Sequence, residues 1–310
     1  MRDPIQLSPL GFGCAPVMGK IGKRQAMTAM LEAFDLGVTH FDVARSYGFG
    51  RAEQVVGQFF EGRRDQVTVT SKFGVVPPTL SLRSRAIIPL ARTAVNLFPQ
   101  LKSRLKKKSG QLLAERRFDV TFAQQCLHQS LSELATDYID IYLIHEPDMA
   151  MLKNPEEITE FLEHNVTTGN IRRWGVAYGL IEDYEWASYL GGDVIQFEGN
   201  TETLPQCGTI LGDARQRIIT RPFLGGLVDK SALESLVQEL ALASALRELN
   251  ASLADVSLCL AHHLAGQTGS VLCSMFYSEH IRKNVRAINE LTGDPQMVRV
   301  INKVLANCHR

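Results

Sequence analysis

The sequence predicts an α/β fold of the (β/α)8 barrel type, formed by one domain over residues 1–310. Short β-rich runs alternate with longer stretches of helical pattern along the whole chain, and eight such runs can be distinguished. No linker rich in proline and serine interrupts them. This alternation is typical of βα units around a parallel sheet, and barrels of this length commonly form a single domain.

The predicted strands are short and rich in β-branched and aromatic residues, as buried strands are. They cover residues 9–15, 38–42, 67–72, 139–145, 172–177, 194–199, 217–223 and 270–275. The predicted helices cover residues 23–37, 51–61, 119–135, 155–168, 181–190, 231–264 in two pieces, 278–291 and 296–307. Leu127, Leu131 and Leu134 illustrate the helical spacing of apolar residues.

An open, doubly wound sheet is the structural alternative. Its dinucleotide-binding fingerprint requires three glycines in a G-x-G-x-x-G pattern. Gly11 and Gly13 begin such a pattern, but Pro16 occupies the position of the third glycine. The sequence therefore favours the closed barrel.

The connection after the third strand contains a predicted insertion at about residues 75–118. Residues 81–117 hold ten Lys or Arg and one acid, Glu115. Loops of this size are usually lids, binding segments or solvated flaps. A solvated or partly helical flap is the simpler interpretation, and attraction of an anionic group on a substrate is the alternative.

The overall charge argues against nucleic acid and anionic membranes as partners, and the cysteines favour a reducing compartment. Thirty-three basic residues balance thirty-three acidic ones, so neither nucleic acid nor an anionic membrane is an expected partner. Six cysteines without a C-x-x-C pair favour free thiols. No secretory leader and no apolar run of about 18 residues is present, so we expect a cytoplasmic protein.

Three predicted strands end on a polar residue where a buried strand would ordinarily continue. Asp42, Lys72 and His145 end the second, third and fourth strands, and Tyr47 follows five residues after Asp42. Charged side chains are seldom buried without a partner. Barrel enzymes place their active sites at the carboxyl ends of the strands, so we expect these four side chains to meet at one mouth.

The four groups complement each other as a device for proton transfer. The Lys72 ammonium is expected to lower the pKa of Tyr47, and the Asp42 carboxylate is expected to keep Lys72 charged. His145, as a neutral imidazole, can donate a hydrogen bond to a carbonyl oxygen. Such general acid–base catalysis typically contributes about 10²–10⁴-fold in rate. The set lacks a redox group.

These residues lie in segments that resemble the aldo-keto reductase superfamily. The clearest is GVTHFDVARSYGFGRAEQVVG at 37–57, which is similar to the strand-two signature of the family. Other similar segments follow in order and spacing: VTVTSKFG (67–74), SLSELATDYIDIYLIHEPD (130–148), GNIRRWGVA (169–177), VIQFEGN (194–200), RPFLGGL (221–227) and SVLCSMFYSEHIRKNVRAI (270–288). The resemblance covers nearly the whole chain except the basic insertion.

The resemblance implies an NAD(P)-dependent oxidoreductase that interconverts an aldehyde or ketone and its alcohol. It implies NADP(H) as the cofactor, with NAD(H) as the alternative, and a small carbonyl or alcohol as the substrate. Tyr47 would be the general acid and base, Lys72 with Asp42 would tune it, and His145 would orient the carbonyl.

The resemblance also implies a set of cofactor contacts. Gln196 would contact the nicotinamide carboxamide, Pro222 with Gly225 and Gly226 would approach the pyrophosphate, and Ser274, His280 and Asn284 would surround the adenosine end. Tight turns are often rich in glycine, so the alternative is that Gly225 and Gly226 only form a turn and do not contact the pyrophosphate.

The chain departs from the family pattern around the nicotinamide. Ala177 and Tyr178 replace a Ser-Asn pair, and Thr220 replaces a stacking tyrosine. These departures leave open a cofactor-binding sensor with little turnover. The position of Lys72 at a strand end separately leaves open a lyase that forms a Schiff base. No metal site is predicted, because His262 and His263 are adjacent in a helical stretch and point in different directions.

Overall fold

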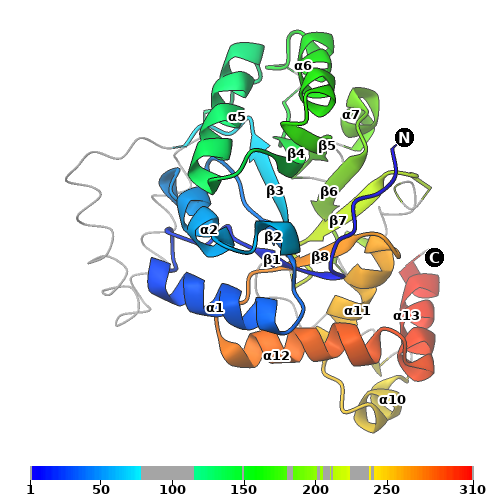
Figure 1. Cartoon of the computed structure of the whole chain (residues 1–310). Coiled ribbons are helices and arrows are strands. Elements are labelled where there is room, and N and C mark those ends of the chain that lie inside the picture. The colour runs from blue at the N-terminus through cyan, green and yellow to red at the C-terminus, as the bar shows by residue number, and fades with distance from the viewer. Residues whose placement is uncertain are drawn as a thin grey trace, which may run out of the picture.

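Eight parallel strands close into a barrel in the order β1-β2-β3-β4-β5-β6-β7-β8, and helices surround it (Figure 1). The computed structural model describes residues 2–77, 115–148, 150–179, 184–200, 203–204, 210, 212–223, 237–238 and 241–308. The predicted (β/α)8 barrel is confirmed. The strand ends that carry the polar residues named above all lie at one mouth, since every strand runs in the same direction.

All eight predicted strands are present, with small differences at their ends. They are β1 (Leu10–Gly13), β2 (His40–Asp42), β3 (Thr68–Phe73), β4 (Ile139–His145), β5 (Ile171–Ala177), β6 (Val194–Glu198), β7 (Gln216–Thr220) and β8 (Ser270–Cys273). β3 continues one residue beyond Lys72, because Lys72 and Phe73 both pair with β4.

The helices on the outside of the barrel also follow the predicted order. They are α1 (Lys23–Asp35), α2 (Ala52–Phe60), α5 (Val120–Leu134), α6 (Pro155–Thr167), α7 (Tyr184–Leu190), α10 (Ala243–Glu248), α11 (Leu253–Ala265), α12 (Ser278–Arg286) and α13 (Pro295–Cys308). Short helical turns lie at η1 (Tyr47–Phe49), η2 (Arg64–Gln66) and η5 (Ala287–Leu291). No helix in these parts of the chain combines the length and apolar character that a membrane crossing requires.

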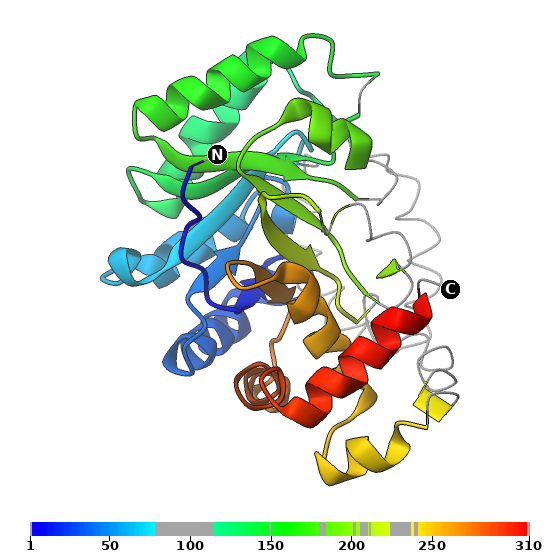
Figure 2. The same cartoon turned by 90° about the vertical axis from the view of Figure 1, so that its right-hand side faces the viewer.

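Of the helical stretch predicted over residues 231–264, residues 231–236 and 239–240 lie outside the described residues, and the break between α10 and α11 has a local cause. α10 ends before Asn250, whose φ is +48°, in the left-handed region that ends helices. α11 then begins with a capping box, in which Ser252 and Asp255 satisfy each other's backbone N–H groups. α13 packs beside α11 at the end of the chain, as Figure 2 shows.

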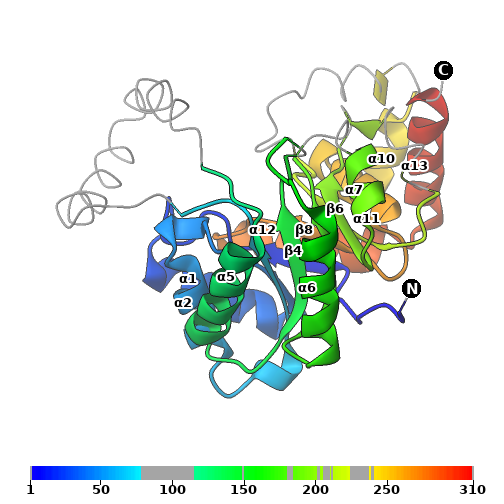
Figure 3. The same ribbon diagram turned by 90° about the horizontal axis from the view of Figure 1, so that it is seen from above.

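Side chains alternate between the inside of the barrel and the layer beneath the helices. On β4, Ile141 and Leu143 belong to a small apolar cluster inside the barrel. Tyr142 and Ile144 belong to the large core under the helices, which includes α5 and its neighbour α6 (Figure 3). Because the period of a strand is two residues, His145 continues the inward row and reaches the mouth.

Candidate active site

Asp42 and Lys72 form a buried ion pair at the mouth of the barrel. Both belong to the inward rows of their strands, since Phe41 and Phe73 point to the outer core. The Lys72 Nζ atom donates to both carboxylate oxygens, at 2.6 and 2.7 Å, and to the carbonyl oxygen of Val43 at 3.1 Å. Three oxygen atoms thus lie within 3.1 Å of the ammonium nitrogen.

Tyr47 is held over this pair by a tight turn. It begins η1, and the next residue, Gly48, has a φ of +59°. A Cβ atom on Gly48 would lie 2.4 Å from the carbonyl oxygen of Val17, so only glycine fits there. The turn places the Tyr47 hydroxyl 3.5 Å from Nζ of Lys72, and that nitrogen lies 5.1 Å from the centre of the phenol ring.

His145 completes the set from β4. Its ring lies edge-to-face against the ring of Tyr47, with centroids 5.9 Å apart and an angle of 80° between the planes. Both residues are half-buried. The structure therefore brings together all four residues that the sequence nominated at the strand ends.

The pKa of Tyr47 is shifted in the direction opposite to the one expected from the sequence. Burial raises the pKa of Tyr47, the Lys72 ammonium lowers it, and the Asp42 carboxylate raises it again, with a net pKa above the ordinary value. The predicted lowering is wrong in its net sign, because burial outweighs the ammonium. Tyr47 is thus a protonated phenol, the form that can donate a proton.

The pKa shifts of Lys72 and His145 favour a charged lysine and a neutral imidazole, as expected from the sequence. Burial alone lowers the pKa of Lys72, but Asp42 and Tyr47 together raise it above its ordinary value, so this lysine stays charged. Burial, with Lys72 and Arg116 nearby, lowers the pKa of His145 to about 3. His145 is therefore a neutral imidazole at physiological pH, with one N–H to donate.

Gln196, the residue expected to contact the nicotinamide, and Tyr178, which departs from the family pattern, both contact other residues of the protein. Gln196 is buried and its Nε2 atom donates to the Asp42 carboxylate at 2.8 Å, across the barrel from β6 to β2. Tyr178 is buried and stacks on Phe197, with centroids 5.8 Å apart. Gln196 therefore contacts the ion pair directly.

The nominated residues at the other end of the cofactor lie after β7 and β8. Ser274 and His280 are exposed, and the Ser274 hydroxyl donates to the Gly13 carbonyl oxygen at 3.0 Å. Asn284 is half-buried and its amide lies 3.7 Å from the sulfur of Met275. Pro222 is buried two residues after β7. Gly225 and Gly226 lie outside the described residues, as does most of the basic segment 81–117.

Sequence reasoning missed two charged pairs close to this site. Arg45, in the loop between Asp42 and Tyr47, pairs with Glu53 inside the protein. Arg116 pairs with Glu146 at 2.7 Å, directly after His145. The signal for the first was a cation followed eight residues later by an acid within the strand-two signature. The second joins two separate connections and has no such signal.

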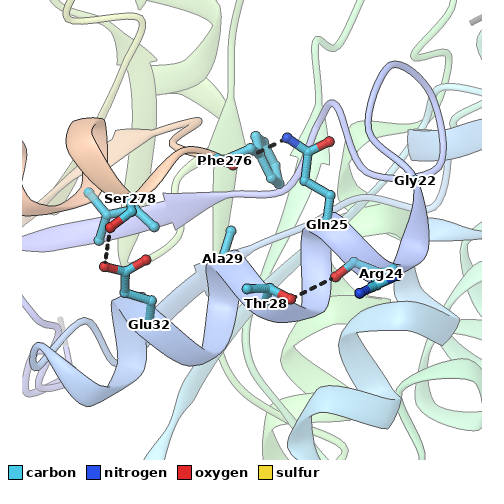
Figure 4. Close-up of a pocket in the computed structure, with 9 residues that line it drawn as sticks. Gly22, Arg24, Gln25, Thr28, Ala29, Glu32, Phe276 and Ser278 are labelled. Atoms are coloured by element: carbon cyan, nitrogen blue, oxygen red, sulfur yellow. Dashed lines mark hydrogen bonds between the residues drawn. The ribbon is translucent and has the colours of Figure 1, made fainter. Parts of the chain in front are cut away.

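A cavity of about 490 Å³ lies outside the barrel, between α1 and α12, and is separate from the four residues (Figure 4). The Gln25 amide donates to the Phe276 carbonyl oxygen at 3.3 Å, and the Ser278 hydroxyl donates to Glu32 at 2.6 Å. Its polar groups thus bind one another across the two helices.

The side chains at the mouth can transfer a proton to an oxygen atom. A protonated phenol, a charged lysine and a neutral imidazole converge there, and no amino-acid side chain among them can deliver a hydride. Within the described ranges, no three His, Cys, Asp or Glu side chains gather as a metal site requires.

Comparisons with known proteins point to one family, the aldo/keto reductases. Residues 9–203 match the Aldo/keto reductase family. The chain is 28% identical over 187 residues to the Aldo-keto reductase YhdN of Bacillus subtilis, covering 58% of this chain and 46% of that protein. It is 24% identical over 304 residues to the Uncharacterized oxidoreductase YqkF of the same organism, covering 92% and 88%. The match thus spans about half of YhdN and most of YqkF.

A solved aldo/keto reductase from Klebsiella pneumoniae, in complex with NADP and acetate, has the same fold. Its TM-score is 0.63 at 20% identity, with 96% of this chain and 92% of that chain covered. The family match spans more than half of the chain, and it includes Asp42, Tyr47, Lys72 and His145. The chain belongs to the aldo/keto reductase family.

Proposed function

We propose that this protein is an NAD(P)H-dependent oxidoreductase that interconverts a small aldehyde or ketone and its alcohol, with Tyr47 as the general acid and base. The observation that carries the proposal is the position of the Lys72 ammonium, which lies between the Asp42 carboxylate and the Tyr47 hydroxyl. This arrangement serves a reaction in which the phenol gives up a proton and becomes negatively charged.

In reduction, the carbonyl oxygen of the substrate lies between Tyr47 and His145. The neutral imidazole donates a hydrogen bond that fixes the oxygen, and the phenol O–H transfers its proton as negative charge develops there. Lys72 stabilises the phenolate that forms, and Asp42 keeps Lys72 charged. In oxidation, the same phenolate removes the proton of the alcohol.

The residues at the mouth fit a nicotinamide dinucleotide. They supply a proton donor, and the proposed reduction also requires a hydride donor. When bound, the nicotinamide supplies or accepts the hydride. Gln196 would hold the carboxamide; Pro222, Gly225 and Gly226 would lie near the pyrophosphate; and Ser274, His280 and Asn284 would hold the adenosine end.

NADP(H) is the first choice of cofactor, supported by the Klebsiella pneumoniae protein of the same fold, which was solved with NADP bound. NAD(H) is the alternative, because the two cations next to the nominated adenosine contacts have acidic partners. Arg282 pairs with Glu32 at 3.0 Å and Lys283 pairs with Glu279 at 2.7 Å. Both cations are exposed, and such surface pairs are weak enough to rearrange around a phosphate.

Separate titrations with NADPH and NADH test the proposal, followed by a panel of aldehydes and ketones. We expect binding of at least one cofactor, seen as a change in its fluorescence, and its oxidation in the presence of a carbonyl compound. Binding of neither cofactor would contradict the proposal.

A cofactor-binding sensor is the second candidate. It is favoured by Tyr178, which is buried against Phe197 where the family pattern has an asparagine. Cofactor binding without turnover of any compound in the panel would select this candidate. The lyase has less support, because Asp42 raises the pKa of Lys72 and a Schiff base requires a neutral amine. Borohydride trapping of a substrate adduct on Lys72 would revive it.

A further inference from the structure

Arg45 fixes the loop that carries Tyr47. Its guanidinium is buried and donates to a carboxylate oxygen of Glu53 and, at 2.8 Å, to the carbonyl oxygen of Gly50. Its backbone N–H donates to the carbonyl oxygen of Lys72 at 3.2 Å. The Arg45 side chain therefore binds residues that follow Tyr47, and the Arg45 backbone binds β3.

Glu53 joins this loop to the strand that carries Lys72. Its side chain is fully buried in the first turn of α2. One oxygen accepts from Arg45, and the other accepts from the Ser71 hydroxyl at 2.6 Å. Ser71 directly precedes Lys72 and points away from the barrel interior, so the same strand holds Lys72 on one face and Glu53 on the other.

Stability alone does not account for this pair. Charges taken out of water are costly, and well-packed apolar residues often replace a buried ion pair without loss of stability. The Arg45 Nε atom is also buried without a hydrogen-bond partner among the described residues, which adds to the cost. What the pair does provide is a side-chain link, beside the backbone bond from Arg45 to Lys72, that fixes the distance between the loop and β3.

That distance is the one on which proton transfer depends. The Tyr47 hydroxyl lies 3.5 Å from Nζ of Lys72, at the outer limit of a hydrogen bond. A further displacement of about 1 Å would separate the phenol from the ammonium that stabilises its charged form, and misplacements of this size can cost about 100-fold in rate.

We propose that Arg45 and Glu53 are positioning residues that hold Tyr47 at its working distance from Lys72. The inference rests on the proposed function, since it assigns the pair to the same proton transfer. It adds two residues, neither of which touches the substrate, and Ser71 as the link between Glu53 and the strand.

The test compares Glu53→Ala, Glu53→Gln and Arg45→Lys with a matched control, Arg64→Met. Arg64 also forms an ion pair with a buried acid, Asp140 at 2.7 Å, but at the opposite end of the barrel. For each variant, kcat and KM, the pH profile of kcat, the cofactor Kd and the Tm are measured.

We expect Glu53→Ala to lower kcat by about 10–100-fold with little change in cofactor Kd, and to move the high-pH limb of the kcat profile. Glu53→Gln should recover most of kcat, because its amide can accept from Arg45 and donate to Ser71. Arg45→Lys should lower kcat at least about fivefold, since one ammonium cannot reproduce the fork of the guanidinium. Arg64→Met should lower the Tm and leave kcat and its pH profile unchanged.

A folded Glu53→Ala variant with wild-type kcat and pH profile would overturn the proposal. If Glu53→Ala does not fold, wild-type kcat in Arg45→Lys would overturn it. If the wild-type protein reduces no carbonyl compound, the proposed function fails first. The positioning role is then decided by crystal structures, in which an unchanged distance between Tyr47 and Lys72 in Arg45→Lys and Glu53→Ala rejects it.

Discussion

Nζ of Lys72 lies 2.6 and 2.7 Å from the two carboxylate oxygens of Asp42, and both side chains are buried. Among the residues that the structure describes, neither group has another ion-pair partner. The charge of Lys72 therefore depends on Asp42, and the chemistry proposed for Tyr47 depends on that charge.

Asp42→Asn removes the acidic half of this pair. Burial then lowers the pKa of Lys72 with little to oppose it, and any remaining charge is unpaired. We expect a loss of about 3–5 kcal/mol in the free energy of unfolding, as for other broken buried pairs, and a kcat reduced by about 10²-fold or more. Denaturant unfolding and steady-state kinetics measure the two effects. Asp140→Asn, at the other end of the barrel, should cost stability and keep kcat; equal kcat in the two variants would refute the assignment.

The pH dependence of reduction follows from the state of Tyr47. Its pKa is raised, with burial as the largest cause, so the phenol keeps its proton well into the alkaline range. We expect kcat for reduction to show no loss from this group until the pH exceeds about 10, the ordinary value for tyrosine. Oxidation of the alcohol needs the phenolate and should rise with pH over the same range. A loss of reduction with a midpoint near pH 7, under conditions where the fold is intact, would be incompatible with Tyr47, whose pKa is raised, as the acid.

Glu146→Gln should move that alkaline limit. Glu146 raises the pKa of Tyr47, so removing its charge should lower that pKa and shift the alkaline limb of kcat to lower pH. The pair with Arg116 is half-exposed and screened, so we expect kcat at pH 7 to change by less than about threefold. Glu198→Gln is the control, since Glu198 pairs with Arg221 over β6 and β7. A shift of the same size in both variants would show that Glu146 has no specific effect.

Acid should destabilise the protein through a histidine inside the barrel. His40 is fully buried, its ring nitrogens lie 2.9 Å from the hydroxyls of Ser270 and Thr70, and burial with the Lys72 charge lowers its pKa to about 3. The unfolded chain takes up the proton at about pH 6.5, so stability is complete above that pH and falls as the pH drops towards 3.

The expected slope is up to about 1.4 kcal/mol per pH unit for each such histidine, with His145 adding a smaller part because it is half-buried. Urea denaturation between pH 7.5 and 4.5 measures it. A free energy of unfolding that stays constant over this range would contradict the buried, neutral state of His40.

The barrel and its four central residues follow from local sequence patterns. The short β-rich runs and the helical spacing between them predicted the order of elements, and residues at the ends of β2, β3 and β4 must meet because these strands are neighbours. Asp42, Lys72 and His145 could therefore be placed together without any knowledge of distances.

The rest of the site depends on facts that local patterns do not contain. The bond from Gln196 to Asp42 joins residues 154 positions apart across the barrel interior. The net shift of the Tyr47 pKa depends on the depth of burial, which outweighs the ammonium predicted to dominate. The pair of Arg116 and Glu146 depends on the path by which the chain returns from the basic segment.

Replacement of Tyr47 by phenylalanine is the sharpest test of the proposed proton transfer. Phenylalanine keeps the ring and its contact with His145 but has no proton to give. We predict that Tyr47→Phe binds the cofactor with a Kd within about threefold of the wild type, while kcat for carbonyl reduction falls by about 10²–10⁴-fold. A Tyr47→Phe variant that binds the cofactor and reduces the same substrate at the wild-type rate would contradict the role of Tyr47 as the proton donor.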